Sequence, residues 1–184
     1  MTAEEKKIIE GCRAGKTEYQ KILYDQYGPD IKAVCIRYAG NEEEGFDLFH
    51  DTFVFILTHF KEYDRITSLG GWLHRIAVNR SIDFYRRKTL HETIPIGEYE
   101  EVFTSTGSHS ADVLTEKQIL DFVNQLPVKQ RMAFNLYEVD GYPEQEIVEM
   151  MGESATNVRT LISRAKKRLR DCIRQYLQNE EYEL

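Results

Sequence analysis

Apolar residues recur every three or four positions over most of the chain, which is the spacing of helices that bury one face. In the N-terminal half, this spacing predicts helices at about 18–38, 43–60 and 69–88. Gly28-Pro29 is a point at which the first helix can bend, because proline removes one backbone hydrogen bond from the helical ladder. Gly40-Asn41 suits the end of that helix, since glycine readily takes the left-handed conformation found there.

The same spacing predicts four helices in the C-terminal half, at about 114–125, 128–138, 143–150 and 154–177. Pro143 suits the first turn of the third helix, where its missing amide hydrogen is not needed. We therefore expect helices on both sides of the middle of the chain.

Residues 89–113 separate the two helical halves. They are rich in Ser, Thr, Gly and Glu, contain one proline and lack a helical apolar period. Because a segment of this length without secondary structure is uncommon inside one compact domain, we interpret it as a linker. The sequence thus predicts an all-α fold of two small helical domains, 1–88 and 114–184, joined by a flexible linker.

The formal net charge of −7 is distributed unevenly along the chain. Residues 1–88 carry 14 basic and 14 acidic groups, whereas residues 89–113 carry 5 acidic groups and no basic ones. Within residues 159–174, seven basic groups accompany a single acid. A basic patch on an acidic molecule indicates DNA binding that is weak alone and is completed by a partner.

Several classes of protein are disfavoured by the sequence. It has no run of eighteen apolar residues, so we expect no membrane insertion, and its N-terminus lacks the apolar core of a secretion signal. Cys12, Cys35 and Cys172 are scattered singly, and we interpret each as a reduced, buried residue of a cytoplasmic protein. No glycine-rich phosphate loop and no paired metal-ligand spacing is present, so we expect neither a cofactor nor a metal.

The segment 143–169 has the pattern of a helix-turn-helix. Gly152 permits a tight turn, and Ser154 can cap the helix that follows. We expect that second helix to bury four apolar residues, which are Val158, Ile162, Ala165 and Leu169.

The opposite side of this second helix has the composition of a DNA-reading surface. Asn, Arg and Thr side chains in its first half can reach base edges in the major groove, and basic residues further on can contact phosphates. A solvated basic helix is the alternative interpretation. The turn, the cap and the polar face together favour DNA reading by Thr156, Asn157, Arg159, Thr160, Ser163, Arg164 and Lys167.

Two further motifs, taken with this segment, resemble one family. DLFHDTFVFIL (47–57) and GWLHRIAVNRSIDFYRRK (71–88) resemble region 2 of the extracytoplasmic-function (ECF) sigma factors of the sigma-70 family. LPVKQRMAFNLYEVDGYPEQEIVEMMGESATNVRTLISRAKKRLR (126–170) resembles their region 4. Both regions are present, in the family's order and with a linker between them.

The resemblance implies a non-enzymatic transcription initiation factor that gives core RNA polymerase its promoter specificity. Its partners would be the beta-prime clamp helices and the beta flap of the polymerase, promoter DNA and, as in many family members, an anti-sigma factor. The residues that match the polymerase-binding surface are Asp47, His50 and Asp51.

The resemblance also assigns DNA-binding surfaces to both halves. The second helix of the helix-turn-helix would read the minus-thirty-five element, and the loop 61–68 would capture a base flipped from the melted strand. The linker would pass through the polymerase towards the RNA path, either as a phosphate mimic or as a solvated spacer. The residues that match the helix reading the minus-ten element are Asn79, Arg80, Asp83, Arg86 and Arg87.

The chain departs from the family pattern at several positions. His50 and Asp51 stand where the family more often has Gln and Glu, and Pro143 stands where Ser is usual. Leu161 stands where Arg is common, so one DNA contact is either missing or replaced by an apolar contact with a thymine methyl. Trp72 is either a base-stacking group or a core residue, and we favour the core.

Two other functions compete with this interpretation. Asp47 and His50 resemble half of a carboxylate-bridged metal site, but a metalloenzyme of that kind needs a second such motif, which is not present. A one-component regulator would have a ligand-sensing domain at 1–88 and an operator-binding domain at 114–184. The basic helix at 71–88 argues against it, because a sensor domain does not need a DNA-reading helix.

Overall fold

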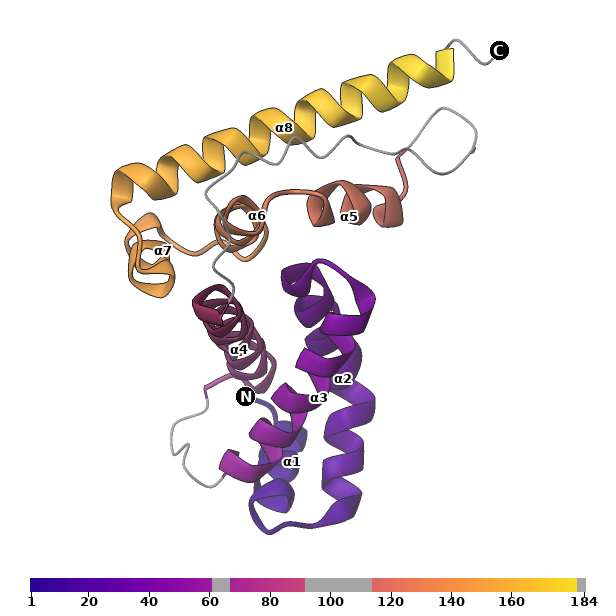
Figure 1. The fold of residues 1–184 in the computed structure, drawn as a ribbon. Helices are drawn as coiled ribbons and strands as arrows, with labels where there is room; N and C mark the ends of the chain where they lie inside the picture. Colours follow the sequence, from indigo (N-terminus) through magenta and orange to yellow (C-terminus); the bar gives the residue numbers. More distant parts are fainter. Residues whose placement is uncertain (61–66, 92–113, 182–184) are drawn as a thin grey trace. The chain divides into compact units, whose positions relative to one another are not determined.

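The computed structural model describes residues 1–60, 67–91 and 114–181. Every regular element in these residues is a helix, which confirms the predicted all-α fold (Figure 1). The helices group into two compact units, Met1–Leu90 and His91–Leu184.

Four helices form unit 1, and these are α1 (Ala3–Arg13), α2 (Thr17–Ala39), α3 (Glu42–His59) and α4 (Leu69–His91). α2 continues through Pro29 and ends at Gly40, whose φ of +88° is the left-handed conformation that suits glycine. Asn41 then caps α3 by accepting a hydrogen bond from the Glu44 amide at 2.8 Å. This short reversal places α2 and α3 side by side.

The contact between α2 and α3 depends on a close backbone approach at Gly45. A Cβ atom at this position would lie 2.7 Å from the Cα atom of Ile36, which is closer than real Cβ contacts. Around this contact, unit 1 buries Leu23, Ile31 and Val34 from α2, and further apolar side chains from the other helices. These are Ile8, Ile9, Leu48, Phe49, Phe53, Ile56, Leu69, Leu73, Ile76, Val78 and Ile82.

The first helix, α1, was not predicted from the apolar spacing. Thr2 and Glu5 form a capping box at its start, in which Thr2 Oγ1 accepts from the Glu5 amide at 3.1 Å and Glu5 Oε2 accepts from the Thr2 amide at 2.6 Å. The pattern Thr-x-x-Glu is the sequence signal that could have identified this helix.

Two apolar expectations for unit 1 need adjustment. The three- or four-residue spacing of apolar positions predicts Phe46 on the buried side of α3, but it is 38% exposed and its ring centre lies 3.9 Å from the Lys32 ammonium group. It sits near the start of α3, where the Lys32 cation lies against its ring. Trp72 is half-buried, with its ring centre 5.0 Å from that of the fully buried Phe60, so it packs at the edge of the core.

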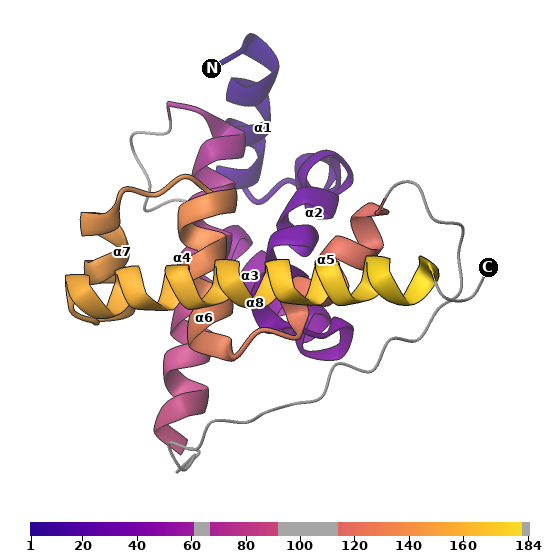
Figure 2. The ribbon, with the colours of Figure 1, turned by 90° about the horizontal axis from the view of Figure 1, so that it is seen from above.

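Unit 2 consists of α5 (Glu116–Asn124), α6 (Val128–Phe134), the π-helical turn η2 (Asn135–Val139), α7 (Glu144–Met151) and α8 (Ala155–Glu181). α8 is the long helix against which the others pack (Figure 2). The predicted helix 128–138 is therefore α-helical only as far as Phe134. It widens into one π turn, in which the Asp140 amide bonds the Asn135 carbonyl at 2.9 Å.

A buried arginine joins α5 to α6. Arg131 is 5% exposed, and its Nη1 donates to the carbonyls of Asn124 at 2.8 Å and Leu126 at 3.3 Å. These carbonyls lie at the end of α5, where helical carbonyls have no partner within their own helix. The guanidinium group therefore fixes α5 against α6.

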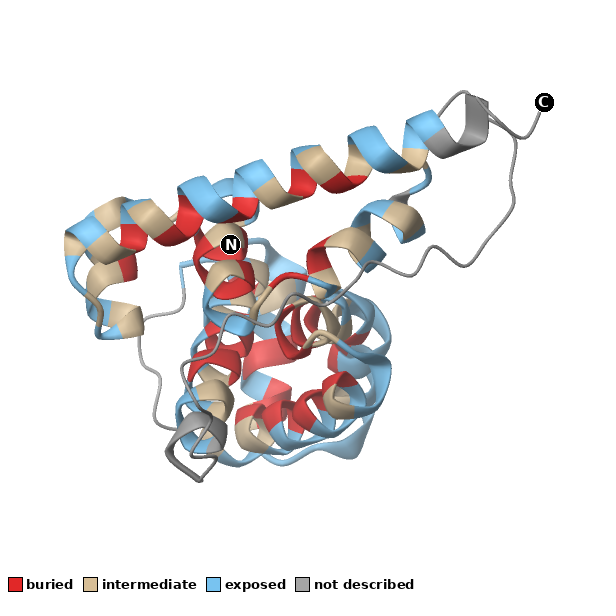
Figure 3. Cartoon of the chain, turned by 45° about the horizontal axis from the view of Figure 1, so that its top comes forward, coloured by how far each residue is buried: buried red, intermediate tan, exposed pale blue. Residues whose placement is uncertain are grey.

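Buried and exposed residues alternate around α8 with the helical period (Figure 3). Val123 and Leu126 pack against its Ala165 and Leu169.

The three cysteines are buried, as predicted, and burial raises the pKa of the Cys35 thiol to about 12.

Candidate nucleic-acid interface

The turn between α7 and α8 has the predicted geometry. Gly152 ends α7 with a φ of +67°, and its amide bonds the Val148 carbonyl at 2.9 Å. Ser154 caps α8, because its Oγ accepts from the Asn157 amide at 3.2 Å. The two helices thus meet as a helix-turn-helix.

One side of α8 is buried as predicted. Val158 and Ala165 are fully buried, and Ile162 and Leu169 are each 8% exposed. Leu161 is also only 8% exposed, because it lies at the edge of the same apolar side. Its side chain therefore belongs to the core, and the alternative of an apolar contact between Leu161 and a thymine methyl is wrong for this conformation.

The opposite side of α8 presents most of the predicted DNA-binding residues. Asn157 and Thr160 are half-buried, and the Thr160 hydroxyl donates to the Thr156 carbonyl at 2.8 Å. The others are exposed: Thr156, Arg159, Ser163, Arg164 and Lys167. We call Thr156, Thr160, Ser163, Arg164 and Lys167 the reading face of α8.

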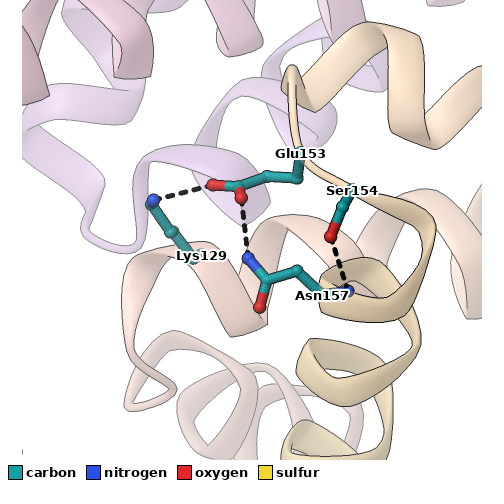
Figure 4. Close-up of polar contacts among 4 residues, drawn as sticks. All are labelled: Lys129, Glu153, Ser154 and Asn157. Atoms are coloured by element: carbon teal, nitrogen blue, oxygen red, sulfur yellow. Dashed lines mark hydrogen bonds and ion pairs between the residues drawn. The ribbon is translucent and has the colours of Figure 1, made fainter.

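A polar network holds Asn157 at one flank of the reading face (Figure 4). Asn157 Nδ2 donates to Glu153 Oε2 at 2.7 Å, and Lys129 of α6 pairs with Glu153 Oε1 at 2.7 Å. The hydrogen bond from Lys129 is the main reason that the pKa of Glu153 lies below its ordinary value, and the bond from Asn157 adds to it. Glu153 is therefore a charged acceptor at neutral pH.

An ion pair holds Arg159 at the other flank. Its Nε donates to Glu144 Oε2 at 2.9 Å, and its Nη2 lies 2.8 Å from Glu144 Oε1. This two-point contact joins α8 to the start of α7. It lowers the pKa of Glu144 and raises that of Arg159, because each ionised partner stabilises the other. Sequence reasoning missed both Glu144 and Glu153. The spacing of four residues between Glu153 and Asn157 is a local signal that could have identified that contact, whereas Glu144 and Arg159 are brought together only by the packing of α7 against α8.

The minus-ten residues predicted on α4 form a second polar surface, in unit 1. Asn79, Asp83, Arg86 and Arg87 are exposed at spacings that bring them to one side of the helix. Arg80 differs, because it is half-buried and its guanidinium carbon lies 4.8 Å from the ring centre of Phe55. The structure thus brings four of these five residues together and packs the fifth against α3.

The residues predicted to bind the polymerase share one exposed side of α3. Asp47, His50 and Asp51 are all exposed. Val54, one turn further along the same side, is 61% exposed and was not predicted as part of this surface. Residues 61–66 of the predicted base-capturing loop and residues 92–113 of the predicted linker lie outside the described residues.

Two family models match the chain. The model for Sigma-70 region 2 matches residues 23–90, and the model for Sigma-70, region 4 matches residues 116–169. The chain belongs to the sigma-70 family.

The relatives of this sigma factor include several ECF sigma factors. ECF RNA polymerase sigma factor SigW of Bacillus subtilis is 25% identical over 92% of this chain and 96% of the relative. RNA polymerase sigma factor SigZ of the same organism is 25% identical over 82% of this chain and 85% of the relative. ECF RNA polymerase sigma factor SigE of Mycolicibacterium smegmatis is 28% identical over 81% of this chain and 59% of the relative. These matches place the protein in the ECF class.

Solved structures support the same fold. The sigma factor RpoE of Bartonella quintana, solved with the anti-sigma factor NepR, matches with a TM-score of 0.54 and 19% identity over 84% of this chain and 96% of that one. CnrH, solved with the cytosolic domain of CnrY, matches with a TM-score of 0.51 and 19% identity over 91% of this chain and 96% of that one.

None of the described helices combines the length and apolarity that a membrane crossing requires.

Proposed function

We propose that this ECF sigma factor binds core RNA polymerase and directs it to promoters, with unit 1 reading the minus-ten element and unit 2 the minus-thirty-five element. The observation that carries the proposal is the reading face of α8, a polar and basic surface on the second helix of a helix-turn-helix. The exposed arginines of α4 are the corresponding feature of unit 1. The polymerase would supply all the chemistry of RNA synthesis, so we expect no catalytic activity from the chain and action in the cytoplasm.

The exposed side of α3 is the proposed polymerase-binding surface. Asp47, His50 and Asp51 offer charge and hydrogen bonding, and Val54 beside them offers apolar area that would gain free energy on burial. A mixed surface of this kind is typical of protein interfaces. An anti-sigma factor is a second partner class, suggested by the structurally similar RpoE, which was solved with the anti-sigma factor NepR.

A transcription assay tests the two DNA surfaces separately. A promoter is first selected from genomic fragments with the chain and core polymerase, and run-off transcription is then measured with variants. Arg164→Ala with Lys167→Ala should lower specific transcription about tenfold, and so should Arg86→Ala with Arg87→Ala, since each pair removes two phosphate or base contacts. Arg174→Ala, on α8 beyond the family match, and Lys21→Ala, on α2, are the matched controls.

The outcome decides between sigma factor and one-component regulator. Unchanged transcription in both double variants would refute the assignment of the two surfaces. If the chain neither binds core polymerase nor alters its choice of start sites, the proposed function itself is wrong.

Asp47→Asn with Asp51→Asn should weaken polymerase binding, whereas Asp25→Asn on α2 should not.

A further inference from the structure

We propose that Glu144 and Glu153 are positioning residues for base recognition, each holding one side chain of α8 in the orientation that reads a base. The proposal rests on the proposed function, because it takes α8 as the helix that enters the DNA groove. It adds two residues, neither on α8 itself, that would determine which bases are preferred.

The two carboxylates act on opposite flanks of one surface. Residues two positions apart on a helix point about 200° away from each other, so Asn157 and Arg159 project on either side of the reading face. Glu153, in the turn before α8, bonds Asn157, and Glu144, at the start of α7, bonds Arg159. The two side chains best suited to reading bases are therefore each fixed by a carboxylate.

The contact with Glu153 decides which end of the Asn157 amide is left to contact a base. A carboxylate can only accept hydrogen bonds, so the amide nitrogen must be the atom that faces it. Figure 4 shows that Asn157 Oδ1 then points away from Glu153. An acceptor left for DNA favours a base that presents an amino group in the major groove, which is adenine or cytosine.

The contact with Glu144 leaves the reading end of Arg159 available. The Glu144 carboxylate contacts the Nε and Nη2 atoms of Arg159, and these two atoms form one edge of the guanidinium group. The N–H groups at its tip, on Nη1 and Nη2, can still form the paired contact with guanine O6 and N7. Arg159 can thus bond Glu144 and guanine at the same time.

Neither carboxylate presents an uncompensated charge to DNA. Lys129 pairs with Glu153, and Arg159 pairs with Glu144. Within the described part of the chain, Arg164 and Lys167 have no ion-pair partner, so they remain for the phosphates. The arrangement separates base reading at the flanks from phosphate binding at Arg164 and Lys167.

The test measures base preference with the polymerase-bound protein. Holoenzyme is mixed with promoters randomised over the minus-thirty-five element, and the bound fraction is sequenced for wild type, Glu144→Ala and Arg159→Ala. Wild type should prefer guanine at one position, and both variants should lose about tenfold of that preference. Adding Glu144→Ala to Arg159→Ala should cause no further loss, because Glu144 acts through Arg159. The same comparison applies to Glu153→Ala and Asn157→Ala at a second position.

Controls separate positioning from simple charge repulsion. Glu149→Ala removes a carboxylate from the same helix, α7, and should leave the base preference unchanged. If Glu144→Ala and Glu144→Gln instead raise affinity equally for all sequences, the carboxylate only repels phosphate and the proposal is overturned.

Two further results distinguish failure of this proposal from failure of the proposed function. If Arg159→Ala loses a preference that Glu144→Ala retains, the positioning role is wrong while DNA reading by α8 stands. If wild-type holoenzyme shows no preference in the upstream element, the proposed function fails and this proposal fails with it. Thermal unfolding of each variant confirms that the protein compared is folded.

Discussion

At the scale of single residues, Glu153 links the stability of unit 2 to pH. Hydrogen bonds from Lys129 and Asn157 hold the pKa of its carboxyl group below the ordinary value of 4.5. The folded protein therefore binds this proton more weakly than the unfolded chain does. The stabilisation from ionised Glu153 is complete above pH 4.5 and is lost as the pH falls through the lowered pKa.

The variant Glu153→Gln tests this linkage, because it cannot ionise. Wild type should lose more stability than the variant between pH 7 and about pH 4, by under about 1 kcal/mol, since the carboxylate is partly exposed to solvent. Urea unfolding followed by circular dichroism at the two pH values measures the difference. Glu149→Gln is the control, and an equal pH dependence in wild type and Glu153→Gln would contradict the assignment.

At the scale of elements, Arg131 has a structural role although it belongs to the unit that carries the basic reading face of α8. It is buried and bonds the carbonyls that end α5, whereas Arg164 projects from the reading face of α8. Arg131→Met should lower the free energy of unfolding of unit 2 by about 2–3 kcal/mol, because it leaves buried carbonyls without donors. Arg164→Ala should change it by less than about 0.5 kcal/mol. Urea unfolding distinguishes the two, and equal midpoints for Arg131→Met and wild type would refute the role.

The elements also show what the sequence could predict. α2, α3, α4 and α8 each bury one side over several turns, so the apolar period indicates them clearly. α1 buries Ile8, Ile9 and Cys12 over little more than one turn. So few apolar positions do not show a helical period clearly. The π turn at 135–139 adds one residue to a helix, and apolar spacing alone does not distinguish it from an α-helix.

The sequence also predicted some parts of the candidate site and missed others. The reading face of α8 follows from the positions of its buried residues on one helix, and Ser154 follows from its place after a glycine turn. The hydrogen bonds that Arg159 donates to Glu144 and that Arg131 donates to the end of α5 depend on how two helices pack, and no local sequence pattern predicts them. Arg80 was grouped with the exposed residues of α4, but it packs against Phe55 of α3. The apolar spacing of α4 alone does not predict this contact with another helix.

At the scale of the whole molecule, net charge opposes DNA binding while local charge favours it. The chain carries a formal charge of −7, yet seven basic groups and one acid lie within residues 159–174. The long-range field of the protein therefore repels the DNA that its basic surface attracts. Each unit alone should bind DNA weakly, and tight binding should require both units to be held on one promoter by a partner.

Competition binding with promoter and random duplexes tests this dependence on a partner. The free chain should bind both weakly, with less than about tenfold preference for the promoter and a steep decline with salt. Addition of core polymerase should raise the preference at least about a hundredfold, because engagement of one element greatly increases the local concentration of the other unit at its own element. A free chain that bound one duplex tightly and selectively at physiological salt would instead behave as a one-component regulator. The polymerase would then not be the source of its selectivity, and the negative net charge would have no part in keeping the free protein off DNA.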